Sequence, residues 1–363
     1  MTTVLSVFLA IGESWEDFEK KGQAQLLLRN NISFYRRAFK QVFVFSYGQK
    51  SGELLPNVEL IPNRFQLHRY IYAILLPFLN REKLQKSDVY RGMQLSGALP
   101  GLIAKYFYHK RLFVNYGYDY GELTRIEGKP VRAFLYKLLE KILLPKLDGT
   151  IVTTQSLRQK LSRSGLTQIH LIPNSVDTKL FKPLKGIQPD IDVLYVGRLE
   201  PQKNLQLLIR AVAEIRTVSL RVVFIGAGSQ KRMLEELGRK LHVELLIFSN
   251  IAHDQLVNFY NRAKIFILPS VIEGHPKALL EAMSCEVAVV GSKIAGITDV
   301  VTSNYDGIVV DPQVGYLSNT IKKLMQNPKL RRRLGKKARK TILKHYLNES
   351  LWLREIRILK GAT

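Results

Sequence analysis

The sequence alternates short apolar runs with longer segments of helical periodicity, and this alternation constrains the fold more than any other feature. In the second half the apolar runs are DVLYVG, LRVVFIG, LLIFSN, KIFILPS, EVAVVGS and GIVVD. Helical patterns fall between them at about residues 204–216, 229–241, 253–262 and 276–284. Buried strands that alternate with amphipathic helices are typical of a parallel sheet covered by helices. The second half is therefore expected to form a doubly wound α/β domain.

The first half has the same rhythm in a less regular form. The runs VLSVFLA, QVFVFSY, RLFVNYGY, GTIVTT and IHLIPN predict strands, and one helix is expected at about residues 16–38. Residues 173–189 are rich in proline and turn formers and resemble a linker. We therefore expect a first Rossmann-like domain at 1–172 and a second at 173–345, with a C-terminal helix, about 346–363, that packs back on the first. Ligands of such sheets bind beyond the carboxyl ends of the strands, so a cleft between the domains is the expected site.

Composition and charge limit the kinds of partner. The chain has 363 residues, of which 46% are hydrophobic and 23% charged, as in a packed globular protein. The net charge of +25 predicts attraction to nucleic acid, anionic lipid or phosphorylated substrates. The densest basic run, residues 329–344, has nine Lys or Arg residues and no acid. It is equally compatible with a solvated helix face and with a membrane or partner contact.

The chain is expected in the cytoplasm, soluble or peripheral on the inner face of the cytoplasmic membrane. Its single cysteine, Cys285, excludes an intramolecular disulfide, and we expect it to be a packed core thiol. Residues 1–10 lack a basic start and predict a buried first strand, not a signal peptide. The longest apolar stretch, residues 70–79, contains Pro77 and falls short of the ~20 residues of a membrane span.

The strongest functional signal is Glu273-Gly274-His275-Pro276, which separates the strand KIFILPS from a helix that continues to Glu281. A helix that begins near Pro276 would offer backbone N–H groups and the positive end of its dipole to an anion. The two carboxylates would hold the hydroxyls of a sugar and a ribose. The alternative is a capped helix with two surface glutamates.

A second signal follows the strand DVLYV, at residues 197–203 (GRLEPQK). A glycine turn that carries Arg198 and Lys203 suits a diphosphate, because the two cations would neutralise charge on a departing phosphate. In so basic a chain, two cations on one loop are also expected by chance.

Together these motifs resemble the retaining glycosyltransferases of the GT-B fold, specifically family 4. The resemblance covers roughly residues 148–345, through IHLIPNSVDTKLFKP, VLYVGRLEPQKNLQLLIRA, VVFIGAG, FILPSVIEGHPKALLEAMSCEVAVVGS and GITDVVTSNYDGIVVDP. It implies two Rossmann-like domains that face a central cleft. It also implies transfer of a sugar from a nucleoside-diphosphate-sugar to a saccharide or lipid-linked acceptor, with retention at the anomeric carbon. Synthesis of cell-envelope polysaccharide or glycolipid is the expected setting.

The resemblance assigns roles to matched residues of the second half. Arg198 and Lys203 correspond to the pair that contacts the donor diphosphate, and Glu273 to the glutamate beside the transferred sugar. Glu281 corresponds to the glutamate that binds the ribose. The loop around Asn250 to His253 corresponds to the stretch that faces the nucleobase. The expected contacts to sugar and phosphate are at Gly197 and at the backbone of Gly274, His275, Pro276, Lys277 and Ala278.

The first half departs from the family pattern. Gly12 stands where the family often has two glycines near the donor phosphate. Asp119 follows the strand RLFVNYG, where many members have a catalytic histidine, so Asp119 is the candidate for that place or the role is missing. His275 replaces an aromatic or aliphatic residue and is a candidate determinant of sugar selectivity; the alternative is a loop histidine without a role.

The sequence disfavours metal and nicotinamide chemistry. The family pattern needs no metal, and the chain's only D-x-D, formed by Asp190 and Asp192, lies at the start of a strand near the linker. Gly226 and Gly228 begin a dinucleotide fingerprint, but the third glycine and the closing acid are missing. No permanently bound cofactor is expected.

Two basic amphipathic segments, residues 65–79 and 131–147, suit an anionic membrane surface and a lipid-linked acceptor. The alternative is that they are core-facing helices of the first domain. A second hypothesis for the whole chain is a non-catalytic basic module that binds anionic membrane or nucleic acid and keeps a decayed donor site. Nucleic acid is disfavoured, because no recognised motif or stacking platform accompanies the charge.

Overall fold

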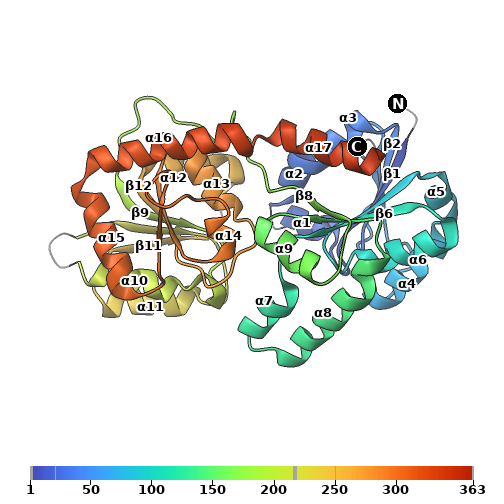
Figure 1. The fold of residues 1–363 in the computed structure, drawn as a ribbon, viewed down its shortest axis with the longest axis horizontal. Helices are drawn as coiled ribbons and strands as arrows, with labels where there is room; N and C mark the ends of the chain where they lie inside the picture. Colours follow the sequence, from blue (N-terminus) through green and yellow to red (C-terminus); the bar gives the residue numbers. More distant parts are fainter. Residues whose placement is uncertain (1–2, 21, 216–218, 250, 362–363) are drawn as a thin grey trace. The chain divides into compact units, whose positions relative to one another are not determined.

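The computed structural model describes residues 3–20, 22–215, 219–249 and 251–361. The chain divides into two compact units. Unit 1 consists of the described parts of residues 1–124, 129–172 and 349–363, and unit 2 of residues 125–128 and 173–348. Each unit is built around a parallel or mostly parallel sheet with helices packed on it (Figure 1), which confirms the predicted α/β fold class.

The sheet of unit 1 has the strand order β3-β4-β2-β1-β5-β6-β7-β8. Its neighbours pair in parallel, except that β3 and β4 pair antiparallel at one edge. The predicted strands are present, and β3, β4 and β5 are additional. The bounds are β1 Val4–Phe8, β2 Gln41–Phe45, β3 Gly52–Leu55, β4 Val58–Ile61, β5 Val89–Gly92, β6 Arg111–Tyr116, β7 Gly149–Val152 and β8 Ile169–Leu171.

Two buried clusters line the two faces of this sheet because successive strand residues point to opposite sides. Leu5 and Val7 belong to one cluster, with α1 to α3 and α17, whereas Phe8 belongs to the other, with α4, α6, α8 and α9. The helices are α1 Trp15–Lys20, α2 Ala24–Leu27, η1 Leu28–Ile32, α3 Ser33–Ala38, α4 Arg69–Leu79, α5 Arg81–Lys86, α6 Ala98–Tyr108, α7 Tyr120–Ile126, α8 Pro130–Leu143, η2 Leu144–Lys146, α9 Gln155–Arg163 and α17 Asn348–Lys360.

The prediction of a single helix at about residues 16–38 is wrong. The segment forms α1, α2, the π-helical turn η1 and α3. Gly22, which follows α1 closely, has φ +66, a left-handed conformation that a continuing right-handed helix does not allow. Apolar periodicity alone did not reveal this break.

The C-terminal helix α17 is joined to unit 1 by a buried ion pair. Arg91 on β5 is fully buried, and its Nε donates to Glu355 Oε1 at 2.8 Å. Tyr35 Oη donates to the same oxygen at 2.7 Å, and the Trp352 ring stacks on Phe34 with centroids 5.5 Å apart. Removal of one partner would leave the other charge buried and unpaired, so α17 is an integral part of this unit.

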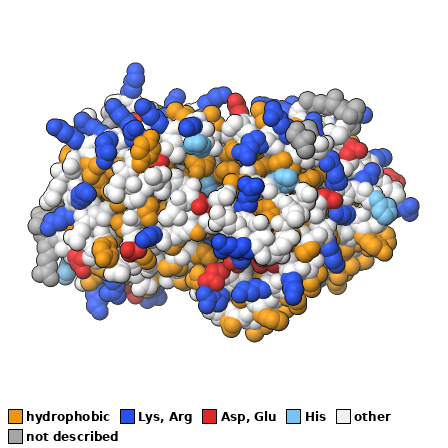
Figure 2. Space-filling model, in the orientation of Figure 1, with side chains coloured by type: hydrophobic (Ala, Val, Ile, Leu, Met, Phe, Trp, Pro, Cys, Tyr) orange, Lys and Arg blue, Asp and Glu red, His pale blue; other side chains and the backbone are white. Residues whose placement is uncertain are grey.

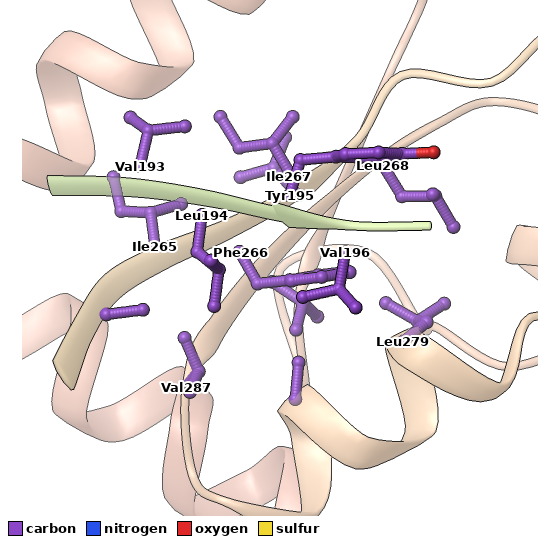
Figure 3. Packing of buried hydrophobic residues seen from close by; sticks show 14 of the residues in the cluster. Val193, Leu194, Tyr195, Val196, Ile265, Phe266, Ile267, Leu268, Leu279 and Val287 are labelled. Atoms are coloured by element: carbon purple, nitrogen blue, oxygen red, sulfur yellow. The ribbon is translucent and has the colours of Figure 1, made fainter. Parts of the chain in front are cut away.

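The sheet of unit 2 is fully parallel, in the order β11-β10-β9-β12-β13-β14, and contains the predicted strands. Its central strands β9 and β12 are buried except at Asp192 and Lys264, and Figure 3 shows their apolar side chains packed with Leu279 and Val287. The strands are β9 Ile191–Val196, β10 Val222–Ile225, β11 Leu245–Phe248, β12 Ala263–Leu268, β13 Ala288–Ser292 and β14 Ile308–Val310. The helices are η3 Pro201–Lys203, α10 Leu205–Ala213, α11 Lys231–Lys240, η4 His253–Gln255, α12 Leu256–Arg262, α13 Lys277–Ser284, α14 Ala295–Thr298, α15 Val314–Gln326 and α16 Pro328–His345.

Within the described residues, no helix is both long enough and apolar enough to cross a bilayer.

Candidate functional site

The candidate donor site lies where the sheet of unit 2 changes its direction of growth. Strands β9, β10 and β11 follow one another toward one edge, and β12, β13 and β14 toward the other, so β9 and β12 are neighbours at the reversal. Open α/β sheets bind ligands at such a point, beyond the carboxyl ends of the strands. Both predicted motifs lie there, with residues 197–203 after β9 and residues 273–276 after β12.

The loop after β9 is fixed by close backbone packing. Gly197 has φ +154, and a Cβ at this residue would lie 2.6 Å from Tyr195 Oη. That hydroxyl donates to the carbonyl oxygen of Arg198 at 2.7 Å. A Cβ at Gly226, in the loop after β10, would lie 1.9 Å from the Gly197 carbonyl oxygen. Loop packing therefore accounts for the glycines near residue 226, and a dinucleotide-binding role is not needed to explain them.

Lys203 and Glu273 form a nearly buried ion pair that joins the two loops. Lys203 Nζ lies 2.6 Å from Glu273 Oε1, and the Ser270 hydroxyl donates to the same oxygen at 2.6 Å. The Glu273 side chain is 1% exposed and that of Lys203 is 11% exposed. A buried carboxylate is costly without a cation beside it, so the contact with Lys203 compensates Glu273 and holds it in place.

Arg198 differs from Lys203 although both were predicted to contact phosphate. Its side chain is exposed, and its guanidinium makes no hydrogen bond or ion pair with the part of the chain that the structure describes. The loop therefore presents one cation that is already paired and one that is available to an anion.

The N-terminus of α13 adds unpaired donors. The helix begins at Lys277, and Pro276 stands at the N-cap, just before the helix rather than in its first turn. No described side chain caps this end, so the amides of Lys277 and Ala278 are open to an anionic ligand at the positive end of the helix dipole. The Lys277 side chain is exposed, and Gly274 is buried behind the turn.

Gly296 supports this turn from behind. A Cβ at Gly296, on α14, would lie 2.2 Å from the carbonyl oxygen of Gly274 and 2.4 Å from that of Glu273. The first turn of α14 thus packs directly on the backbone that positions Glu273. The segment GITDV contributed to the family resemblance, but sequence reasoning gave this glycine no role.

Glu281 is the centre of a second polar cluster. Its Oε1 lies 2.8 Å from His253 Nε2, and its Oε2 accepts a hydrogen bond of 2.8 Å from the Tyr260 hydroxyl. Tyr260 is fully buried, and burial, together with the Glu281 charge, raises its pKa well above the usual value. Each Glu281 oxygen keeps acceptor capacity for a further donor, as the predicted ribose role requires. Asn250 lies outside the described residues.

His275 is held within the protein. It is 4% exposed, and burial lowers its pKa to about 3, so the ring is neutral at physiological pH. The ring lies against Tyr346, with centroids 5.3 Å apart, and the His275 carbonyl oxygen accepts a hydrogen bond of 2.6 Å from Asn174 Nδ2. In the structure the ring packs against the protein; its influence on sugar selectivity stays a prediction.

The candidate site residues of unit 1 are Gly12 and Asp119. Gly12, with φ +84, follows β1 where the sheet reverses between β1 and β5, and the preceding amide of Ile11 donates to Ser96 Oγ at 3.3 Å. Asp119 accepts a hydrogen bond of 3.0 Å from the Glu122 amide, and its other oxygen pairs with Lys160. Asp119 therefore supports the first turn of α7, which its predicted catalytic role did not anticipate.

The D-x-D carboxylates are paired with cations of the protein. Asp190 accepts two hydrogen bonds from the Arg262 guanidinium, at 2.7 and 2.5 Å, and Arg262 holds its pKa below the usual value. Asp192 Oδ1 lies 2.7 Å from Lys264 Nζ. These contacts give the motif a structural role in unit 2, and metal independence stays a prediction.

Sequence reasoning missed Ser270, Tyr260 and Gly296. Ser270 precedes Glu273 by three residues, a spacing that lets both side chains meet on one turn, but a serine at the end of an apolar run is not a distinctive signal. Tyr260 falls on the apolar face of α12, so it could not be distinguished from an ordinary core aromatic.

The chain is similar to known glycosyltransferases. Residues 177–341 match the family model "Glycosyl transferases group 1". The chain is 22% identical to the capsular polysaccharide biosynthesis glycosyltransferase CapM of Staphylococcus aureus, over 90% of this chain and 91% of that one. It is 32% identical to D-inositol 3-phosphate glycosyltransferase of Acidothermus cellulolyticus, over 40% of this chain but only 37% of that relative's length.

Among solved structures, the sucrose-phosphate synthase of Thermosynechococcus elongatus has the same fold. The TM-score is 0.84 at 18% identity, and the match covers 99% of this chain and 98% of that one. The chain thus has the GT-B fold, and its residues 177–341 are similar to the glycosyl transferases group 1 family.

Proposed function

We propose that this protein is a retaining, metal-independent glycosyltransferase that moves a sugar from a nucleoside-diphosphate-sugar to a saccharide or lipid-linked acceptor. The observation that carries the proposal is the arrangement around α13. The Lys203–Glu273 pair precedes the helix, an uncapped N-terminus begins it, and Glu281 lies one stretch further along. Cations and amides beside two fixed carboxylates suit a ligand with a diphosphate flanked by two sets of hydroxyls.

In this proposal each part of the donor has its own partners. Glu281, oriented by His253 and Tyr260, accepts the ribose hydroxyls. Arg198 and the first amides of α13 bind the diphosphate, and Glu273 accepts a hydroxyl of the transferred sugar. The two carboxylates are held before the donor arrives, so little reorganisation opposes binding.

The chemistry is departure of a nucleoside diphosphate from the anomeric carbon. Negative charge grows on the leaving phosphate oxygen, and Arg198, Lys203 and the α13 dipole stabilise it without a metal. The acceptor hydroxyl attacks the anomeric carbon from the face that the phosphate leaves and gives its proton to that phosphate. The new glycosidic bond then keeps the anomeric configuration of the donor.

The relatives support a setting in polysaccharide or glycolipid synthesis. The match of similar length is a capsular polysaccharide biosynthesis glycosyltransferase. A basic chain suits acceptors that carry phosphate or other anionic groups.

The direct test is transfer or slow hydrolysis of UDP-, GDP- and ADP-sugars, followed by proton NMR of the first-formed sugar product. The proposal predicts turnover of one donor class with the donor's anomeric configuration kept, and no loss of rate in excess EDTA. An inverted product, or activity abolished by EDTA and restored by Mg²⁺ or Mn²⁺, would contradict it. Absence of donor binding and turnover in folded protein would favour the non-catalytic alternative.

A further inference from the structure

Three helices of unit 1 carry apolar side chains on their outer faces. α4, α6 and α8 pack with their inner sides on the same buried cluster of the sheet. Most of the exposed large apolar side chains of the described residues lie in residues 65–79, 106–107 and 131–142. We call this area the α4–α6–α8 surface; Figure 2 shows hydrophobic side chains over these helices along the lower edge of unit 1.

α8 shows the pattern most clearly. On its inner side, residues such as Ala133 and Leu143 are buried. A second apolar stripe faces outward with helical spacing, at Val131, Phe134, Leu135, Leu138, Leu139 and Ile142, with exposures between 43% and 73%. A helix that only covers a sheet needs one apolar side. The outer stripe therefore points to something that the isolated chain does not supply.

The stripe continues across the neighbouring helices. On α4, Ile74 and Phe78 are 52% and 46% exposed, and the Phe78 ring contacts Phe107 of α6 with centroids 4.9 Å apart. The Tyr108 hydroxyl donates to the Pro77 carbonyl oxygen at 2.9 Å, and Lys105 Nζ donates to the Lys146 carbonyl oxygen at 2.9 Å, just beyond α8. These contacts make the three helices one continuous surface.

The charge on this surface has one sign. Residues 64–79, 98–110 and 129–146 contain nine Lys or Arg residues and a single acid, Glu140. Glu140 is buried and accepts a hydrogen bond of 2.7 Å from Tyr116, so it does not offset the cations outside. Arg132, Lys137 and Lys141 are exposed, and helical spacing places them on the flanks of the α8 stripe.

We propose that the α4–α6–α8 surface docks this protein on the surface of an anionic lipid bilayer. An outward apolar stripe flanked by cations suits the boundary between acyl chains and negatively charged headgroups. A second copy of the chain fits less well, because an isologous interface would bring the same set of cations together. The inference goes beyond the proposed function and does not depend on it.

The test is flotation of the full-length protein with vesicles of phosphatidylcholine alone and of phosphatidylcholine with one third phosphatidylglycerol. Two variants remove the two components, Phe134→Ser with Leu138→Ser, and Lys137→Glu with Lys141→Glu. The matched control for charge is Lys336→Glu with Lys340→Glu on α16, which changes two exposed lysines at the same spacing. The control for hydrophobicity is Tyr316→Ser on α15, a side chain 56% exposed.

Wild-type protein should float with the anionic vesicles only, and added salt should weaken the binding. Each α8 variant should lower the partition coefficient by at least about tenfold, and each control by less than about threefold. Circular dichroism and melting curves establish that each variant is folded. Equal losses in α8 variants and controls, or no vesicle binding by folded wild type, would overturn the proposal. A change from dimer to monomer in the Phe134 and Leu138 variant, with vesicle binding unchanged, would assign the surface to self-association instead.

Discussion

The two units share an architecture but differ at the points where their sheets reverse. In unit 2 the reversal between β9 and β12 is surrounded by Arg198, the Lys203–Glu273 pair and the free N-terminus of α13. In unit 1 the equivalent loops after β1 and β5 carry Gly12 and Ser96, and the Ile11 amide joins them by a hydrogen bond to Ser96 Oγ. The same frame thus offers the same place for a ligand, and the residues on the loops decide which chemistry is available.

The outer helices of the two units, α16 and α8, also differ in the exposure of their apolar side chains. α16 of unit 2 carries the densest basic run, yet its apolar residues Leu334, Ala338 and Ile342 are buried, and Leu343 is its single exposed large apolar side chain. α8 of unit 1 has fewer cations but exposes a complete apolar stripe. Charge density alone therefore does not identify a membrane surface; the burial of the apolar side chains distinguishes the two helices.

The largest expected effect separates the two cations of the unit 2 site. Lys203→Met leaves the Glu273 carboxylate buried without its cation, so it should lower the stability of the protein by about 3–5 kcal/mol as well as kcat by at least about 100-fold. Arg198→Met removes an exposed guanidinium, so it should lower kcat by a similar factor with almost no change in Tm. Melting curves and initial rates of both variants measure this difference.

Equal losses of Tm in the two variants would show that the Lys203–Glu273 pair has no special structural role. Ser270→Ala, which removes only the second hydrogen bond to Glu273, serves as an intermediate case. It should cost about 1 kcal/mol.

Support of the Glu273 turn is tested by Gly296→Ala. The added methyl group would lie within 2.4 Å of two carbonyl oxygens, so the turn must shift. We expect a loss of about 1–3 kcal/mol in stability and weaker donor binding. The matched control is Gly315→Ala on α15, where a Cβ meets nothing within 4 Å and stability should stay the same or rise slightly. If Gly296→Ala bound the donor with unaltered affinity, α14 would have no role in positioning the site.

The pH dependence of stability should reflect His275. The pKa of this histidine is about 3 in the folded state and 6.5 in a free side chain, so between these values only the unfolded state takes up the proton. The contribution of neutral His275 to the free energy of unfolding is fully present above about pH 6.5. It decreases as the pH falls, and at pH 5.5 it is lower by about 1.4 kcal/mol. His275→Phe should therefore reduce the drop in Tm between pH 7.5 and 5.5 by a few degrees. His109→Asn, at an exposed position of unit 1, should leave the drop unchanged. Equal pH profiles for His275→Phe and wild type would contradict this assignment.

The smallest expected effect concerns Asp119 of unit 1. Asparagine is as good an N-cap as aspartate, and the Lys160 pair is partly exposed, so Asp119→Asn should change stability by less than about 1 kcal/mol. If Asp119 only supports α7, kcat should also stay within about threefold. A drop of kcat by more than about 100-fold at unchanged Tm would establish the catalytic role that the sequence suggested.

The sequence predicted unit 2 better than unit 1 for physical reasons. Buried parallel strands such as Ile191–Val196 and Ala263–Leu268 are apolar apart from their second residues, Asp192 and Lys264, and their spacing leaves little freedom in topology. The break at Gly22 and the strands β3 and β4 were missed because a single glycine and strands of 4 residues give weak patterns, and β3 at the edge has no buried residue. Arg91, an isolated arginine in the short run VYRG, gave no sign that it pairs with Glu355, 264 residues away.

The predicted site residues were found by motif, but the contacts that hold them were not. A motif specifies which side chains meet a ligand, whereas Tyr260 and Gly296 act on those side chains from other elements of the fold. Their roles depend on tertiary distances, such as the 2.8 Å between Tyr260 and Glu281, that no local pattern contains.

Binding of a nucleoside diphosphate to unit 2 through Glu281 can be measured by isothermal titration of UDP, GDP and ADP into wild type, Glu281→Gln and Tyr260→Phe. We expect one nucleotide to bind wild type. We expect Glu281→Gln to weaken binding of this nucleotide by about 10- to 100-fold and Tyr260→Phe to weaken it less, since the carboxylate remains. Equal affinity of that nucleotide for folded wild type and folded Glu281→Gln would show that Glu281 does not bind it.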